Sequence, residues 1–330
     1  MTVFFSLILV LLLSVLGYIG GSASGLNTFF GVVIPYLAIA VFLIGMAYRI
    51  VRWALSPVPF RIPTTCGQEK SLPWIKANRL DNPSSGACAV GRMLLEILLF
   101  RSLFRNTKAE LREGPKLTYG ENKFLWLGAM AFHWSFLFIL LRHLRFFLEP
   151  IPGFILIAQD LDGFFQIGSP ILYLTDIIIL GGLLYLLGRR IVNLQIRYFS
   201  LFADYFALFL LIGLALSGVF LRYFVKTDLL GVKELAMGLV TLSPVAPAGI
   251  SPIFFMHLFL LSVLLAYFPF SKLMHMGGVF LSPTRNLANN NRMKRHINPW
   301  NYPVKVHSYE EWEEEFKDKI KACGLPIEKA

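Results

Sequence analysis

The chain has 330 residues, of which 56% are hydrophobic and 15% aromatic, and its formal net charge is +11 at pH 7. A mean hydropathy of +0.61 excludes an ordinary soluble domain, and several apolar runs reach the ~20 residues that a helix needs to cross a bilayer. Basic residues flank these runs, so we attribute the charge to membrane topology and expect lipid, not nucleic acid, as its partner.

Six apolar segments predict transmembrane helices. The first has the position of a secretory signal, but no basic region precedes its apolar run, so we interpret it as a spanning helix. The expected fold class is an all-α membrane protein, a six-transmembrane-helix bundle with a cytoplasmic loop and a C-terminal tail. The predicted spans are residues 3–21, 29–53, 123–148, 169–188, 201–222 and 252–276.

The distribution of Lys and Arg predicts the orientation of these helices. Residues 54–122 contain ten of them and residues 276–330 contain nine, whereas the two connections on the opposite side contain only Lys226 and Lys233. Because basic loops stay in the cytoplasm, we expect a multi-pass protein of the cell membrane with both termini cytoplasmic.

The cytoplasmic segments contain two further predicted helices. Residues 93–112 read as an amphipathic helix, in which Arg101, Arg105, Lys108 and Arg112 share one face. Such a helix would lie on the anionic inner membrane surface or dock a partner, and a solvated basic face is the alternative. In the tail, Ser308 and Glu311 predict a capping box that starts a short surface helix.

The three cysteines are Cys66, Cys88 and Cys323, all in predicted cytoplasmic segments. None belongs to a C-x-x-C-H motif or to a group of four, so they predict neither covalent haem nor an iron–sulfur cluster. Any haem must therefore be bound non-covalently, and any cluster must belong to another subunit.

Four histidines lie inside two predicted spans, His133 and His143 in one, His257 and His275 in the other. Ionisable side chains in a bilayer are costly and usually functional, and neutral imidazole is an axial ligand of haem. The two helices run antiparallel, so His143 should pair with His257 near the outer face and His133 with His275 near the cytoplasm. We therefore predict two bis-histidine b haems; the alternative is packed or boundary histidines.

The spacing of the histidines does not match in the two helices. At 1.5 Å per residue, His133 and His143 lie ~15 Å apart, whereas His257 and His275 lie ~27 Å apart. We expect helix tilt and a kink at Pro269 to absorb the difference.

Charged residues near the outer pair are candidates for cofactor and quinone binding. Arg142 and Arg145 flank His143 and would bind haem propionates, because the guanidinium fork suits carboxylates; snorkelling boundary arginines are the alternative. Asp176 lies within a span at the depth of His257, so we predict that it accepts a quinol proton; the alternative is a hydrogen-bond partner of an imidazole or a hydroxyl. Weaker candidates are Asp160, Asp162, Arg222 and Lys226.

The spacings H-x9-H in one helix and H-x17-H in a later one resemble the cytochrome b (gamma) subunit of respiratory nitrate reductase, over about residues 120–280. The loop VPFRIPTTCGQEKSLPWIKANRLDNPSSG at 58–86 is similar to that of the membrane subunits M of Dsr complexes, which are linked to dissimilatory sulfite reduction. This second likeness extends across the whole chain.

The resemblance implies a dihaem cytochrome b that oxidises menaquinol in sulfite or sulfate metabolism. It implies four haem ligands, His133, His143, His257 and His275. The implied partners are a cytoplasmic iron–sulfur subunit K, similar to heterodisulfide reductase, and other Dsr complex subunits. The expected parts of the chain are two N-terminal helices, a cytoplasmic loop, a four-helix dihaem domain and a cytoplasmic tail, at residues 1–53, 54–122, 123–276 and 277–330.

A second class of function stays open at this point. A haem-free membrane anchor, or a transporter subunit that uses the histidines as a proton relay, would also place histidines inside a bilayer. Transporters more often have broken helices and paired internal repeats, and this sequence has no such repeat. A haem absorption band would discriminate the two classes.

Overall fold

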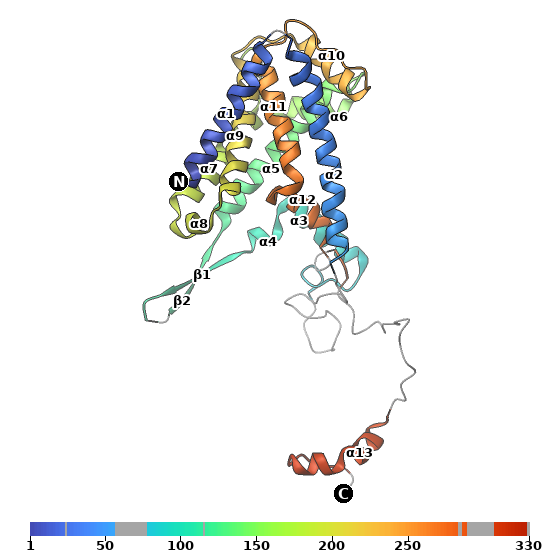
Figure 1. The fold of residues 1–330 in the computed structure, drawn as a ribbon. Helices are drawn as coiled ribbons and strands as arrows, with labels where there is room; N and C mark the ends of the chain where they lie inside the picture. The colour runs from blue at the N-terminus through green and yellow to red at the C-terminus, as the bar shows by residue number, and fades with distance from the viewer. Residues whose placement is uncertain (24, 57–77, 115, 283–285, 289–306, 329–330) are drawn as a thin grey trace.

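A bundle of long helices forms the body of the computed structural model (Figure 1). Its six long helices are α1 (Thr2–Ser22), α2 (Ile34–Ala54), α5 (Lys123–His143), α7 (Leu174–Val192), α9 (Phe202–Tyr223) and α11 (Pro252–Tyr267). This confirms the predicted fold class. The structure describes residues 1–23, 25–56, 78–114, 116–282, 286–288 and 307–328.

Among the described residues, five helices are long and apolar enough to cross a membrane. α7 is the sixth helix of the bundle, and its 19 residues include Asp176 near one end and Arg189 and Arg190 near the other. The segment that enters α2 begins with a π-helical turn, Phe29–Val33.

Small residues bring the helices close together. α1 packs against α9 and α11, α5 packs against α7, and α11 also packs against α2 and α9. A Cβ atom added to Gly17 of α1 would lie 3.0 Å from the Cα atom of Met256 in α11, and one added to Gly128 of α5 would lie 2.4 Å from the ring of Tyr185 in α7. Close backbone approach at glycine is how transmembrane helices gain dispersion contacts in lipid.

Several shorter elements lie at the two ends of the bundle (Figure 1). At the end where the chain begins lie α8 (Leu194–Phe199), the hairpin of β1 (Thr107–Arg112) and β2 (Lys116–Glu121), and α12 (His275–Leu281). The opposite end carries α6 (Gly153–Asp162) and α10 (Leu229–Val240). An even number of long helices returns the chain to the end where it started.

The predicted amphipathic helix over residues 93–112 is wrong in its second half. α3 (Gly86–Leu99) is followed by Phe100, whose φ is +47°, and then by the short α4 (Arg101–Phe104). Residues 107–112 are strand β1, paired antiparallel with β2. The four basic residues therefore do not share one helical face.

Contacts outside the segment explain why α3 ends where it does. The carbonyls of Leu98 and Leu99 accept hydrogen bonds from the indoles of Trp134 and Trp126 in α5, at 3.0 and 2.7 Å. Helix-terminal carbonyls need such partners. The buried Glu96 accepts from the backbone N–H of Ser102 at 3.1 Å, which satisfies the start of the next turn. Tertiary contacts therefore override the helical pattern.

The predicted span 252–276 is not one continuous helix. α11 ends at Tyr267, and Pro269 lies in a 3₁₀ turn, Phe268–Phe270. Ser271 is extended, and its side chain accepts a hydrogen bond at the start of a second turn, Lys272–Met274, before α12 begins at His275. The expected kink at Pro269 is thus a break.

The C-terminal helix α13 (Tyr309–Ala322) begins as predicted. The Ser308 hydroxyl accepts from the N–H of Glu311 at 3.2 Å, and the Glu311 carboxylate accepts from the N–H of Ser308 at 3.1 Å. The capping box is confirmed.

Candidate functional site

Two pairs of imidazole rings face each other between α5 and the broken segment that starts with α11. The ring centroids of His143 and His257 lie 6.3 Å apart with an angle of 14° between the planes. Those of His133 and His275 lie 6.0 Å apart at 83°. The structure therefore brings together the same pairs that the antiparallel topology predicts. The ring planes are nearly parallel in the His143–His257 pair and nearly perpendicular in the His133–His275 pair.

The spacing of each pair fits two ligands of one metal ion. A metal–imidazole bond is about 2.0 Å long, and the ring centre lies about 1 Å beyond the bound nitrogen, so imidazoles on opposite sides of one ion have centroids about 6 Å apart. A haem iron with an imidazole on each face has this arrangement. Among the described residues, no group of three or more His, Cys, Asp or Glu side chains could hold a metal ion by itself.

Three of the four histidines donate Nδ1–H to a backbone carbonyl of their own segment. A carbonyl oxygen only accepts, so each of these neutral rings carries its proton on Nδ1 and keeps the lone pair of Nε2 for a metal. Metal-binding histidines commonly have such a partner, which fixes the tautomer and the ring orientation. The acceptors for His133, His143 and His275 are the carbonyls of Ala129, Ile139 and Lys272, at 2.7, 2.7 and 2.9 Å.

His257 differs from the other three because its partner belongs to another helix. Its Nδ1 lies 2.8 Å from the hydroxyl oxygen of Ser217 in α9. Ser217 is buried, and it is not among the residues that the sequence predicted for the site. A serine within a predicted span is the signal that could have found it, since such residues often bond across helices.

The break in α11 allows the second histidine pair to form. A continuous helix would carry His275 ~27 Å from His257, beyond the ~15 Å between the two histidines of α5. The chain leaves the helix at Pro269, and His275 approaches His133 from the following turns. The predicted mismatch is therefore resolved by the backbone.

Aromatic rings surround His133. The rings of Phe132 and Phe100 meet it edge-on, with centroids 4.8 and 4.9 Å away. Phe132 is its neighbour in α5, whereas Phe100 comes from a distant part of the sequence. Phe100 reaches the site because the chain breaks there between α3 and α4, which no local pattern indicates.

Arg142 is buried in a polar network at the α6 end of the bundle. Its Nη2 donates to Asp176 at 2.7 Å and to Thr175 at 3.1 Å. Its Nε forms an ion pair with Asp162 at 3.1 Å, and its guanidinium lies 3.9 Å from the ring centroid of Tyr173. A haem propionate would therefore meet Arg142 through Nη1.

The predicted proton acceptor, Asp176, belongs to the same network. Besides Arg142, it accepts a hydrogen bond from the hydroxyl of Tyr223 at 2.8 Å. That hydroxyl accepts from the N–H of Tyr173 at 3.0 Å. Asp176 is buried, whereas Tyr223 is half-buried, so the pair extends from the network toward the bundle surface.

Two of the remaining charged candidates, Arg145 and Arg222, lie near this network. Arg145 donates to Gln159 of α6 at 3.1 Å and is half-buried. Arg222 lies over Tyr173, 4.0 Å from the ring centroid, and donates to a backbone carbonyl. Asp160 and Lys226 are both exposed.

A second polar cluster lies beside the inner pair. The buried Asp204, at the start of α9, accepts from Lys272 at 2.8 Å and from the N–H of Leu201 at 2.9 Å. Arg190 lies 3.6 Å from the same carboxylate. Because Lys272 also provides the carbonyl that accepts from His275, this cluster joins α9 to the segment that holds an inner histidine.

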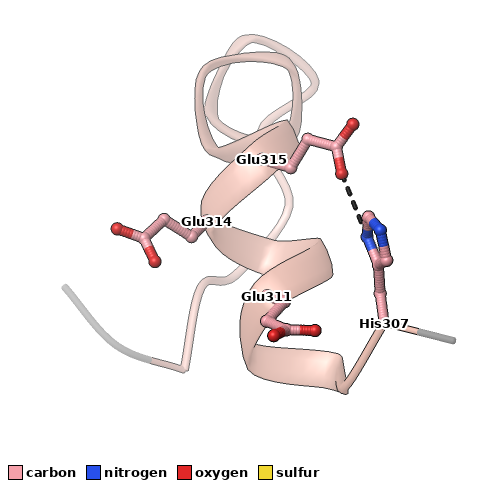
Figure 2. Close-up of a pocket in the computed structure, with 4 residues that line it drawn as sticks. All are labelled: His307, Glu311, Glu314 and Glu315. Carbon is pink, nitrogen blue, oxygen red and sulfur yellow. Dashed lines mark ion pairs between the residues drawn. The ribbon is translucent and has the colours of Figure 1, made fainter. Parts of the chain in front are cut away.

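The tail carries an acidic pocket of a different kind. Figure 2 shows His307 turned toward Glu315, 3.1 Å away, with Glu311 nearby and Glu314 pointing elsewhere. All four side chains come from the first turns of α13 or from the residue before its cap. His307 and Glu315 are largely exposed, which is typical of a solvated surface.

The two cysteines that the structure describes are unpaired. Cys88 is half-buried, Cys323 is exposed, and both are free. Cys66 and His296, like most of the loop segment 58–86, lie outside the described residues.

The chain is similar to known proteins at the level of a family and of individual sequences. Residues 102–295 match the family described as nitrate reductase gamma subunit, a stretch that contains all four paired histidines. An Archaeoglobus fulgidus protein named "Hdr-like menaquinol oxidoreductase cytochrome b-like subunit" is 48% identical over 282 residues, which is 83% of this chain and 84% of that protein. A protein of the same name from Archaeoglobus profundus is 42% identical over 274 residues, 81% of each chain.

Proposed function

This chain belongs to the nitrate reductase gamma subunit family, and from that membership we propose that it is the dihaem cytochrome b subunit of a menaquinol oxidoreductase. It is a multi-pass membrane protein. In the proposed function, menaquinol is oxidised near the outer face, and electrons pass through two b haems to a cytoplasmic iron–sulfur subunit. The proposed domains are residues 1–53, 54–122, 123–276 and 277–330.

The observation that carries this proposal is the geometry of the two imidazole pairs. Each pair has the centroid spacing of two ligands on one metal ion, ~6 Å, at 6.3 and 6.0 Å. A bound haem supplies one-electron redox chemistry, and four proposed ligands, His133, His143, His257 and His275, would hold two haems through Nε2. The chain's own contribution is to fix the ring orientation through Nδ1.

We propose that Arg145 is the principal propionate partner of the outer haem. Arg145 is half-buried beside His143, and it contacts the neutral Gln159, with no ion pair to a carboxylate among the residues that the structure describes. Arg142 would bind a propionate only through its Nη1, because its Nη2 donates to Thr175 and Asp176 and its Nε is ion-paired with Asp162.

The proposed quinol site lies at the outer haem, next to the Arg142 network. Asp176 is the proposed proton acceptor, since it is the carboxylate of that network that contacts Tyr223 at the edge of the bundle. Oxidation at this face would release protons outside while electrons move inward. The energy stored by moving one charge across the membrane potential is about 2.3 kcal/mol per 100 mV.

The proposed partner lies on the cytoplasmic side. The relatives' names include "Hdr-like", which supports an iron–sulfur partner similar to heterodisulfide reductase, the subunit K of a Dsr-type complex. Sulfite or sulfate metabolism is the proposed setting, on the basis of the sequence resemblance. Both termini and the loop 54–122 would face this partner.

Haem analysis of the purified protein and its histidine variants tests the proposal. We expect two b haems per chain by extraction and by reduced-minus-oxidised spectra. His143→Ala and His257→Ala should remove one spectral component, and His133→Ala and His275→Ala the other. Because the inner and outer rings differ in mutual angle, the two irons should be distinguishable by EPR.

The matched control is His307→Ala, a change of an exposed histidine in the tail that should leave both haems in place. A wild-type protein without a haem absorption band would contradict the proposal and favour the haem-free anchor or proton relay. Loss of the same component in the His143 and His275 variants would contradict the pairing.

A further inference from the structure

The four histidines of the paired site differ in one respect that mutagenesis can address. Three rings donate Nδ1–H to backbone carbonyls of their own segments, which side-chain substitution cannot remove. His257 instead reaches across to α9, where the Ser217 hydroxyl oxygen lies 2.8 Å from its Nδ1. One of the four rings is therefore held by a side chain.

The direction of this hydrogen bond follows from the hydroxyl's other contact. Ser217 has one hydroxyl proton, and its oxygen lies 2.9 Å from the carbonyl oxygen of Leu214. That carbonyl can only accept, so the Ser217 proton is directed to Leu214, and the hydroxyl lone pair accepts from Nδ1–H of His257. The Nε2 lone pair of His257 is therefore left for a metal ion shared with His143.

The surroundings of Ser217 leave this ring little freedom. Ser217 is 2% exposed, so bulk water does not compete for His257. The next residue of α9, Gly218, lies against the ring, and a Cβ atom added there would be 3.4 Å from Cε1 of His257. α9 thus provides a hydroxyl and a flat backbone surface at adjacent positions.

We infer that Ser217 is the positioning residue of the outer histidine pair, which sets the tautomer of His257 and the electron donation of its imidazole to the bound metal. This inference rests on the proposed haem ligation. A hydrogen bond from the non-ligating nitrogen raises the basicity of a metal-bound imidazole. A more basic ligand stabilises the oxidised metal, so loss of this bond should raise the reduction potential of the outer haem alone.

The experiment is a redox titration of three purified variants, with each haem followed by its own spectrum. Ser217→Ala should keep both haems and shift the reduction equilibrium of the outer haem by about tenfold, or ~59 mV for a one-electron couple. Ser217→Thr keeps a hydroxyl that a helix can direct to a preceding carbonyl, and it should restore the wild-type potential. The inner haem is the internal reference.

Ser262→Ala is the matched control. Ser262 is similarly buried in α11, the helix of His257, but its hydroxyl donates to the carbonyl of Leu258, at 2.8 Å, within its own helix. This variant should shift neither haem. Selective loss of the outer haem in Ser217→Ala, with both haems retained in Ser217→Thr and Ser262→Ala, would also support the inference.

Two outcomes would overturn the inference. One is an unchanged outer potential in Ser217→Ala with both haems bound, and the other is an equal effect of Ser262→Ala or an equal disturbance of both haems. Failure of the proposed function is distinguishable from these, because the wild-type protein would then lack two haems before any serine is changed.

Discussion

Arg142 shows how a buried charge is accommodated at the end of the bundle. A guanidinium without partners in a low-dielectric interior is strongly unfavourable, and Arg142 has two carboxylates, Asp162 and Asp176, and the face of Tyr173. Asp162 also accepts from the N–H and hydroxyl of Thr175, at 2.8 and 2.6 Å. These contacts join α5, α6 and α7 beside His143.

The proposed role of Asp176 in quinol oxidation is testable with a change that removes only its charge. Asp176→Asn should slow reduction of the outer haem by a quinol analogue by about tenfold or more, because an amide cannot take up the proton, while Asp162 still pairs with Arg142. Both haem spectra should be retained. Stopped-flow reduction across the pH range measures this effect.

Asp160→Asn is the control for Asp176→Asn, since Asp160 is an exposed carboxylate of the neighbouring α6. It should reduce at the wild-type rate. If Asp176→Asn also reduces at that rate, Asp176 is not the proton acceptor and its role is confined to the Arg142 ion pair.

At the scale of elements, the segment after α11 places an inner histidine by means of a polar tether. Asp204 caps the start of α9 through the N–H of Leu201 and also binds Lys272, whose carbonyl accepts from His275. Lys272 is 72% exposed, so its ion pair is screened and contributes ~1 kcal/mol at most. Of the two side chains, the buried carboxylate of Asp204 therefore contributes more to stability than the exposed ammonium group of Lys272.

Asp204→Ala should weaken the inner haem selectively. Loss of a helix cap costs about 0.5–2 kcal/mol, and here the same change also frees the His275 segment. We expect the inner spectral component to be lost at a lower temperature than in the wild type, with the outer component unchanged. Asp228→Ala is the matched control, because Asp228 caps α10 through the N–H of Leu230, at 3.0 Å, at the other end of the bundle. Equal loss of both components would refute a local effect.

The junction of α3 and α4 is held by a second carboxylate, Asp81. It accepts hydrogen bonds from Arg101 and Arg105. The hydrogen bond from Arg101 holds the pKa of Asp81 well below its usual range, against the opposing effect of burial, and Arg105 lowers the pKa further. These contacts hold α3 and α4 as two separate helices where the sequence predicts one continuous helix.

The pH dependence of this junction follows from the lowered pKa. A carboxylate with a depressed folded-state pKa contributes stability that is present above its unfolded pKa, ~3.9, and is lost as the pH falls through the folded value. Hydrogen exchange in residues 86–104 should therefore stay slow from about pH 7 down to about 4 in the wild type. Asp81→Asn should speed it at neutral pH, whereas Glu113→Gln, at an exposed position of the hairpin, should not. Slow exchange in Asp81→Asn at neutral pH would show that the ion pairs do not hold the junction.

At the scale of the whole molecule, the two histidine pairs lie at different depths between the same elements. The inner pair is near the end that carries α3, α4 and α12, and the outer pair is near the end that carries α6 (Figure 1). Two redox centres at different depths suit electron entry at one face and exit at the other. The basic loop and tail make the inner end the proposed side of the partner.

Deletion of residues 58–77 tests this docking side. The deletion spares Asp81 and the Ser85 cap of α3, so the bundle should keep both haems while the proposed iron–sulfur partner is released during affinity purification. Replacing the same segment by a glycine–serine linker of equal length controls for its length. Loss of haem with the partner still bound would contradict the proposed docking surface.

The sequence by itself determined the long apolar helices and the pairing of the histidines. In a bilayer every backbone group must be satisfied within a helix, so long apolar runs were sufficient to predict the bundle. The antiparallel order of the two histidine segments pairs His143 with His257 and His133 with His275, although a continuous helix would have set His257 and His275 ~27 Å apart, against ~15 Å for the two histidines of α5. The missing N–H of proline indicated a kink at Pro269, whereas the structure has a break there.

Only the tertiary structure decided which polar groups meet across helices. Ser217 and His257 are 40 residues apart, Lys272 and Asp204 are 68 apart, and Arg142 finds carboxylates on two other helices. Such contacts depend on the rotation of each helix about its axis, which packing at residues such as Gly17 and Gly128 sets. The end of α3 at Leu99 could not be predicted from the local sequence either, because the indoles that donate to its terminal carbonyls come from α5. Local patterns record which face of a helix is apolar, but a nearly uniform apolar span has no such face, so its neighbours decide what each polar side chain meets.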